Sequence, residues 1–105
     1  MALTRDFMDT VKERAQRDPE FRVGLLTEAA ECFLKGEVEE GKLLLRDYVN
    51  ATIGFHKLSE KVGKKPESLM RMLSATGNPR ADNLSQLIST LGKHEGVELH
   101  VEACS

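Results

Sequence analysis

The fold depends on Gly54-Phe-His-Lys-Leu-Ser-Glu-Lys-Val-Gly63-Lys-Lys-Pro-Glu-Ser-Leu-Met-Arg-Met-Leu73. Leu58 and Val62 are four residues apart, so they share one face of a first short helix. Gly63 ends that helix, because glycine adopts left-handed backbone without a Cβ clash. Pro66 suits the first turn of a second helix. The apolar face of this second helix is supplied by Leu69, Met72 and Leu73. The stretch therefore predicts two short helices around a tight turn, the helix-turn-helix arrangement.

Cations are concentrated in this stretch. They are Lys57, Lys61, Lys64, Lys65 and Arg71, against Glu60 and Glu67. In a DNA-binding helix-turn-helix the second helix enters the major groove, and long cations beside it contact phosphates. The alternative is an ordinary bundle in which two amphipathic helices carry a solvated basic face. Hydrophobic spacing alone does not distinguish these two interpretations.

The distribution of charge favours a localised nucleic-acid contact. The net charge of the 105-residue chain is −2, which argues against a protein that coats nucleic acid indiscriminately. Residues 1–50 contain eight Lys or Arg against eleven Asp or Glu. Residues 54–93 contain seven Lys or Arg against three Asp or Glu. Positive charge thus gathers around the motif, as a DNA footprint requires.

Helices are expected along most of the remaining chain. The first runs from about residue 4 to 17, with Thr4 or Asp6 as its cap. Asp18-Pro19 starts a second helix that stops at Lys35-Gly36. A third covers about 37–50, and a further helix begins at Arg80 or Asp82 and ends at Gly92. This pattern predicts a mainly α fold, divided into an N-terminal helical extension (1–36) and a helix-turn-helix domain (37–105).

The C-terminal segment differs from the rest of the chain. Residues 97–102, Val-Glu-Leu-His-Val-Glu, alternate strictly between apolar and polar, which predicts a β-strand. An unpaired strand is not stable alone, so it is expected to pair with its copy in a homodimer. A frayed tail and a strand lying on the helices are the alternatives.

No enzymatic or metal site is expected. His94, His100 and Cys104 match no zinc-ligand spacing, and no nucleophilic triad, phosphate loop or acid pair is present. No cofactor is expected. Two cysteines do not form a disulfide framework, and no stretch is apolar and long enough for a signal peptide or a membrane span. We therefore expect a cytoplasmic protein.

The chain resembles the lambda-repressor/Cro-like (Xre) helix-turn-helix family in three segments: Leu58–Gly63, Lys64–Leu73 and Gly77-Asn-Pro-Arg-Ala-Asp-Asn-Leu84. With Gly24-Leu-Leu-Thr-Glu-Ala upstream, it is most similar to the addiction-module antidote (antitoxin) branch. The resemblance covers roughly residues 21–102. It implies a homodimeric repressor that binds double-stranded operator DNA. It also implies that the repressor neutralises a RelE/ParE-like toxin.

The predicted DNA-binding residues come partly from charge and partly from the resemblance. The resemblance implies a recognition helix from Pro66 to Leu73 and a backbone-contacting loop at 78–80. The complete set is Lys57, Lys64, Lys65, Glu67, Ser68, Arg71, Asn78 and Arg80.

Two departures from the family pattern keep a second hypothesis open. Phe55 stands where the family has Gln, and Glu67 repels phosphate although it can accept from a cytosine amino group. The alternative function is a protein-interaction module with the same fold and little DNA affinity. Residues 7–34 then either cap the core or hold a partner protein.

Overall fold

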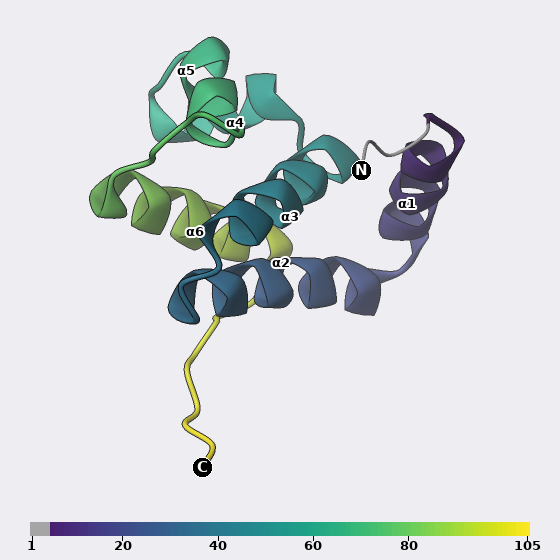
Figure 1. Cartoon of the computed structure of the whole chain (residues 1–105). Helices are drawn as coiled ribbons and strands as arrows, with labels where there is room; N and C mark the ends of the chain where they lie inside the picture. The colour runs from purple at the N-terminus through teal and green to yellow at the C-terminus, as the bar shows by residue number, and fades with distance from the viewer. Residues whose placement is uncertain (1–4) are drawn as a thin grey trace.

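The computed structural model of the chain describes residues 5–105, with side chains from Thr10 onward. The described residues form six α-helices and no strand (Figure 1). The helices are α1 (Arg5–Arg17), α2 (Pro19–Leu34), α3 (Val38–Ala51), α4 (Phe55–Val62), α5 (Pro66–Met72) and α6 (Ala81–Glu95). The predicted mainly α class is confirmed. Of the two predicted caps of the first helix, Asp6 lies within α1 and Thr4 lies outside the described residues.

The predicted start of α2 is confirmed. Asp18 has extended backbone, and its carboxylate accepts a 3.2 Å hydrogen bond from the Phe21 amide. Pro19 is the first helical residue, where a missing N–H has no consequence. α2 then packs against α3 and α6, while α1 contacts both α2 and α3.

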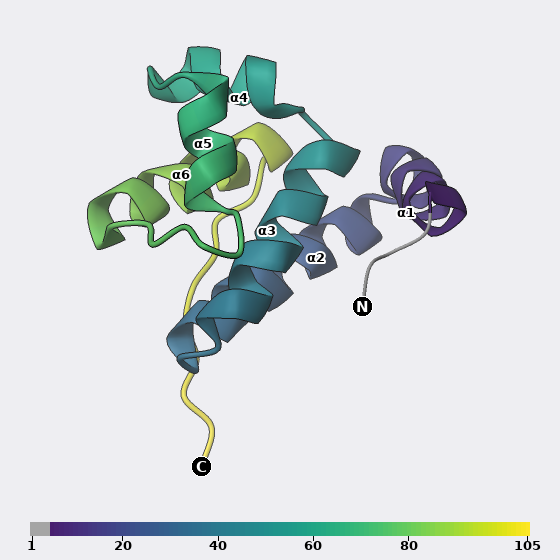
Figure 2. The ribbon, with the colours of Figure 1, turned by 45° about the horizontal axis from the view of Figure 1, so that its top comes forward.

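The helix-turn-helix is also formed as predicted. α4 ends at Gly63, which has φ +70° and ψ +27°, and its N–H donates to the Ser59 carbonyl. Pro66 begins α5 after only two further residues, so no continuous helix runs through the turn. Figure 2 shows α4 and α5 together at the end of the molecule farthest from the C-terminus.

One hydrophobic core joins the helices from α2 to α6. Its fully buried members include Leu26, Leu45, Leu58, Leu69 and Leu91. α2 therefore contributes to the same core as the helix-turn-helix. The division at residue 36 stays a prediction.

The predicted C-terminal strand is wrong. Residues 97–105 are extended chain without a ladder, and the end of this segment projects beyond the helices (Figures 1 and 2). Leu99 is half-buried against the core, whereas Val101 is 73% exposed. The alternation thus reflects an extended segment with one side against helices. A β-ladder needs a second extended segment, and the described chain offers none. The homodimer expected from this segment stays a prediction.

The predicted end of the last helix is also wrong. α6 continues past Gly92 to Glu95 and stops at Gly96, whose φ is +79°. Gly92 is buried inside the helix, and a Cβ there would lie 3.2 Å from the Val97 carbonyl. This glycine therefore allows the returning chain to pass close to α6, where the Val97 amide donates to the Gly92 carbonyl.

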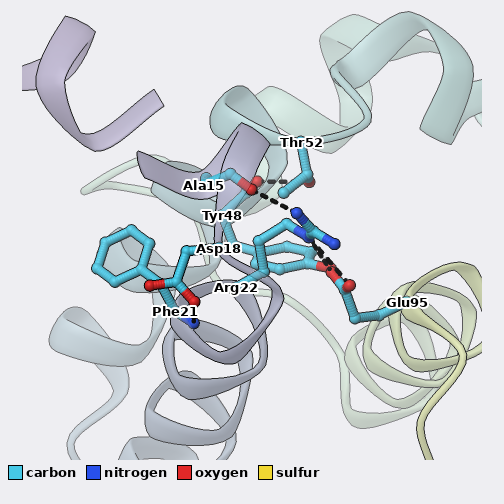
Figure 3. A network of polar contacts seen from close by, with 7 residues as sticks. All are labelled: Ala15, Asp18, Phe21, Arg22, Tyr48, Thr52 and Glu95. Carbon is cyan, nitrogen blue, oxygen red and sulfur yellow. Dashed lines mark hydrogen bonds and ion pairs between the residues drawn. The ribbon is translucent and has the colours of Figure 1, made fainter. Parts of the chain in front are cut away.

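A polar network ties four helices together (Figure 3). Glu95 of α6 accepts from the Tyr48 hydroxyl of α3 and from the Arg22 guanidinium of α2. Arg22 also donates to the Ala15 carbonyl of α1. The network fixes α1 and α6 against the α2–α3 pair, at the opposite end of α3 from residue 38.

None of the helices in the described part of the chain is long and apolar enough to cross a membrane.

Candidate nucleic-acid interface

A groove of about 780 Å³ runs beside α5. Four segments build it: the turn between α4 and α5, α5 itself, the 73–80 loop and the start of α6. Its lining residues are Lys64, Lys65, Ser68, Arg71, Met72, Thr76, Gly77, Asn78 and Asn83. The groove is therefore a product of the helix-turn-helix together with the loop that follows it.

The groove is cationic. Three of its lining residues, Lys64, Lys65 and Arg71, are positively charged and none is acidic. Lys65 and Arg71 are exposed, and Lys64 is half-buried. Among the described side chains, no carboxylate forms an ion pair with these three cations. The arrangement suits a polyanion, because the cations are free to contact phosphates.

The structure brings together five of the eight predicted DNA-binding residues. They are Lys64, Lys65, Ser68, Arg71 and Asn78. The other three lie outside the groove lining, and all are exposed: Lys57 on α4, Glu67 on α5 and Arg80 before α6. Arg80 is also engaged locally, since its guanidinium lies 3.4 Å from the Asp82 carboxylate.

The two departures from the family pattern have structural explanations. Phe55 is the first residue of α4 and is buried in the core, so its ring packs inside the protein. Glu67 is on α5 but does not line the groove, so its carboxylate is not among the groups that a phosphate in the groove would contact. Its position in the first turn also suits the positive end of the helix dipole.

Sequence reasoning missed two polar groove residues, Thr76 and Asn83. Both carry side chains that can hydrogen-bond a phosphate or a base edge. Thr76 lies in an irregular loop and Asn83 in the first turn of α6. Neither belongs to the charged stretch, so only their spatial position identifies them.

A third missed residue, Lys42, supports the groove from inside. It is 2% exposed, and it is the one buried charged residue among the described side chains. Its ammonium donates to the Gly77 carbonyl at 2.7 Å and to the Ala75 carbonyl at 3.4 Å. It also pairs with Glu39, three residues earlier on α3, at 3.1 Å. The Glu39–Lys42 spacing was visible in the sequence, but it indicates only a surface ion pair on one helix.

A cluster at the α2–α3 turn resembles a metal-ligand set but is not assigned as one. The ligand atoms of Cys32, Glu37 and Glu40 all lie within 4.8 Å of one another. Burial, followed by the charges of Glu37, Glu40 and Glu28, raises the pKa of the Cys32 thiol. Cys32 is therefore held as the neutral thiol.

The outer face of α2 forms a second groove, of about 650 Å³. It is lined by Pro19, Glu20, Val23, Gly24, Thr27, Glu28 and Glu31. A Cβ on Gly24 would meet no atom of the described residues within 4 Å. None of the three glutamates is ion-paired within the described residues. Three of the seven residues that line this groove are thus acidic, and the groove is open at Gly24.

Comparison with known proteins gives no relative for this chain: no family model, no curated protein and no solved structure matches it.

Proposed function

We propose that this protein is a sequence-specific regulator that binds double-stranded DNA through α5 and the cationic groove beside it. The observation that carries this proposal is the gathering of Lys64, Lys65 and Arg71 in one groove with no acidic lining residue. A recognition helix delivers specificity through base edges, while surrounding cations provide affinity through phosphates. Arg71 is the residue best suited to read a base, because a guanidinium can bind guanine with two hydrogen bonds.

The resemblance described for the sequence supports a narrower form of the proposal. In that form the protein is the antitoxin of a toxin–antitoxin module, represses its own operon and neutralises a RelE/ParE-like toxin. Its operator then lies in the upstream region of its own gene. That region is the DNA with which the proposal is best tested.

The test is a binding titration with the upstream region of its own operon, over a salt series. Arg71→Ala is expected to weaken specific binding by about 1–3 kcal/mol. The matched control is Arg17→Ala, which removes an exposed arginine at the end of α1, outside the groove. Binding that depends on neither sequence nor salt would reject the proposal, as would equal losses in the two variants.

A second candidate function is a protein-interaction module with little DNA affinity. The outer groove of α2 favours it. A glycine in mid-helix costs about 0.5–1 kcal/mol relative to alanine, and nothing within the described chain requires Gly24. Close approach of another chain would explain the glycine. Glu20, Glu28 and Glu31 then select a partner with a basic helix.

Co-purification with the product of the adjacent gene separates the two functions. Gly24→Leu fills the α2 groove and is expected to abolish the complex while DNA binding persists. Lys12→Leu, at an exposed position of α1, is the control and is expected to leave the complex intact. A tight complex with no DNA shift at low salt would favour the interaction module.

A further inference from the structure

We infer that Lys42 is a positioning residue for the cationic groove: from inside the protein it holds the 73–80 loop and sets the place of Asn78. The inference rests on the proposed DNA-binding function of that groove. Lys42 itself touches no nucleic acid, since its side chain is buried.

The hydrogen bonds of Lys42 explain why a charge is buried at this position. The ammonium donates hydrogen bonds to Gly77 O and Ala75 O, and it forms an ion pair with Glu39 Oε1. Burying an unpaired charge is strongly unfavourable, whereas an apolar side chain would fill the same space without that cost. Both hydrogen-bond acceptors are loop carbonyls. The lysine is therefore matched to the loop rather than to its own helix.

Apart from Lys42, the loop is held mainly at its start, where Leu73 is buried and the Ser74 amide and hydroxyl both donate to the Arg71 carbonyl. Residues 73–80 contain no helix or strand, and their internal backbone hydrogen bonds within the described chain are limited to one turn, from the Gly77 amide to the Ser74 carbonyl. Gly77 lies so close to the end of α5 that a Cβ would clash with the Arg71 carbonyl. Lys42 thus fixes the loop from one side, and the end of α5 limits it from the other.

This conformation places Asn78 in the groove. Asn78 follows Gly77 directly and is exposed, so the carbonyl of one residue is held inward while the next side chain lies at the surface. Both Asn78 and Arg71 line the groove. If the two loop carbonyls lost their donor, Asn78 would no longer be held at a fixed distance from Arg71.

The first experiment measures the loop without DNA. Lys42→Met keeps an apolar chain of similar volume and removes the donor. Hydrogen exchange at the Gly77 amide is expected to accelerate about tenfold or more relative to exchange in the core. Glu39→Gln, which leaves both loop hydrogen bonds in place, is expected to change this rate by less than about twofold. Tyr48→Phe is the control for global unfolding. It destabilises the protein at a site away from the loop, so any acceleration that it causes at the Gly77 amide comes from unfolding of the whole protein.

The second experiment measures affinity for the upstream DNA in a double-mutant cycle. Lys42→Met and Asn78→Ala are each expected to weaken binding about five- to tenfold. If Lys42 acts through Asn78, the two losses of affinity are not additive. The double variant is then expected to bind at most about twofold less tightly than whichever single variant has the lower affinity. A global effect of the lost charge would instead give additive losses.

Three results would overturn the inference: unchanged exchange at Gly77 in Lys42→Met, the same acceleration in Tyr48→Phe, or additive losses in the cycle. Should Lys42→Met fail to fold, the same comparisons are made with Lys42→Gln, whose shorter amide cannot reach both carbonyls. If the wild-type protein binds no duplex, the proposed function fails. The exchange comparison then decides by itself whether Lys42 orders the loop.

Discussion

Tyr48 on α3 donates a 2.6 Å hydrogen bond from its phenol to Glu95 Oε1 on α6 (Figure 3). The same carboxylate receives the Arg22 guanidinium at 3.0 Å, so α2, α3 and α6 meet at one acidic side chain. The hydroxyl group therefore bonds to a charged acceptor in a partly buried site. Such a bond stabilises more than one between neutral groups.

The pKa of Tyr48 is raised above its ordinary value of 10.0, first by burial and then by the hydrogen bond and charge of Glu95. Tyr48 is the only tyrosine of the chain, so phenolate absorbance reports this group alone. In the folded protein we expect the absorbance to stay low as pH rises through 10. In denaturant it is expected to rise near the ordinary value. A folded-state transition near the ordinary value would contradict the prediction.

The same shift makes stability depend on pH. The folded pKa lies above the unfolded pKa, so the contribution of Tyr48 is fully present below the unfolded value and is lost as pH rises above it. The free energy of unfolding is therefore expected to fall as pH is raised beyond about 10. Denaturant titrations at several pH values measure this fall. The fall in unfolding free energy is expected to be smaller in Tyr48→Phe. An identical fall in the wild-type protein and the variant would show that the pH dependence does not come from Tyr48.

Removing the phenol hydroxyl also tests the strength of the hydrogen bond. Tyr48→Phe is expected to lower the free energy of unfolding by about 1.5–3 kcal/mol, because the acceptor is charged. Thr52→Val provides a comparison nearby. It removes a 2.7 Å hydrogen bond from the Thr52 hydroxyl to the neutral carbonyl of Tyr48. Its expected loss is about 0.5–1.5 kcal/mol. Urea unfolding measures the loss of unfolding free energy in each variant. A larger loss in Thr52→Val than in Tyr48→Phe would contradict the assignment of the stronger hydrogen bond to Tyr48.

Two glycine-to-alanine substitutions are expected to have opposite effects. Gly63→Ala places a Cβ on left-handed backbone at φ +70° and is expected to destabilise by about 1–2 kcal/mol. Gly24→Ala adds a Cβ to the exposed middle of α2, where none of the described residues has an atom within 4 Å. It is expected to stabilise by about 0.5–1 kcal/mol. Thermal unfolding shows whether each variant is more or less stable than the wild-type protein. Stability changes in the same direction would count against this account of the turn.

The salt dependence of DNA binding tests the groove directly. Lys65→Ala removes one exposed groove cation, so the slope of log affinity against log salt is expected to shrink by about one. Lys12→Ala removes the same charge from α1, outside the groove, and is expected to leave the slope nearly unchanged. Equal slopes for the two variants would place the phosphate contacts elsewhere.

Several elements could be predicted from the sequence because their causes are local. The cap at Asp18-Pro19 and the break at Gly63 each depend on one residue and its immediate neighbours. The start of α5 at Pro66 has the same kind of cause. The surplus of cations between residues 54 and 93 is also a property of the sequence itself.

Other features depended on residues far apart in the chain. The alternation at 97–102 was real, yet a strand requires a partner strand, and the described chain supplies only helices. Gly92 resembled a helix end, but the tertiary structure buries it where the chain returns beside α6, and Gly96 ends the helix instead. In both cases the prediction from the local pattern was wrong, because contacts from distant parts of the chain decided the structure of the segment.

The sequence by itself thus determined the helices, most of their ends and the presence of a basic helix-turn-helix, since caps and backbone conformations act over a few residues. Only the tertiary structure decided which cations share a groove, because that groove combines two helices, a turn and a loop. It also decided the role of Lys42, whose carbonyl partners are 33 and 35 residues away along the chain. A buried ammonium must find acceptors wherever the fold provides them, and no local pattern specifies where that is.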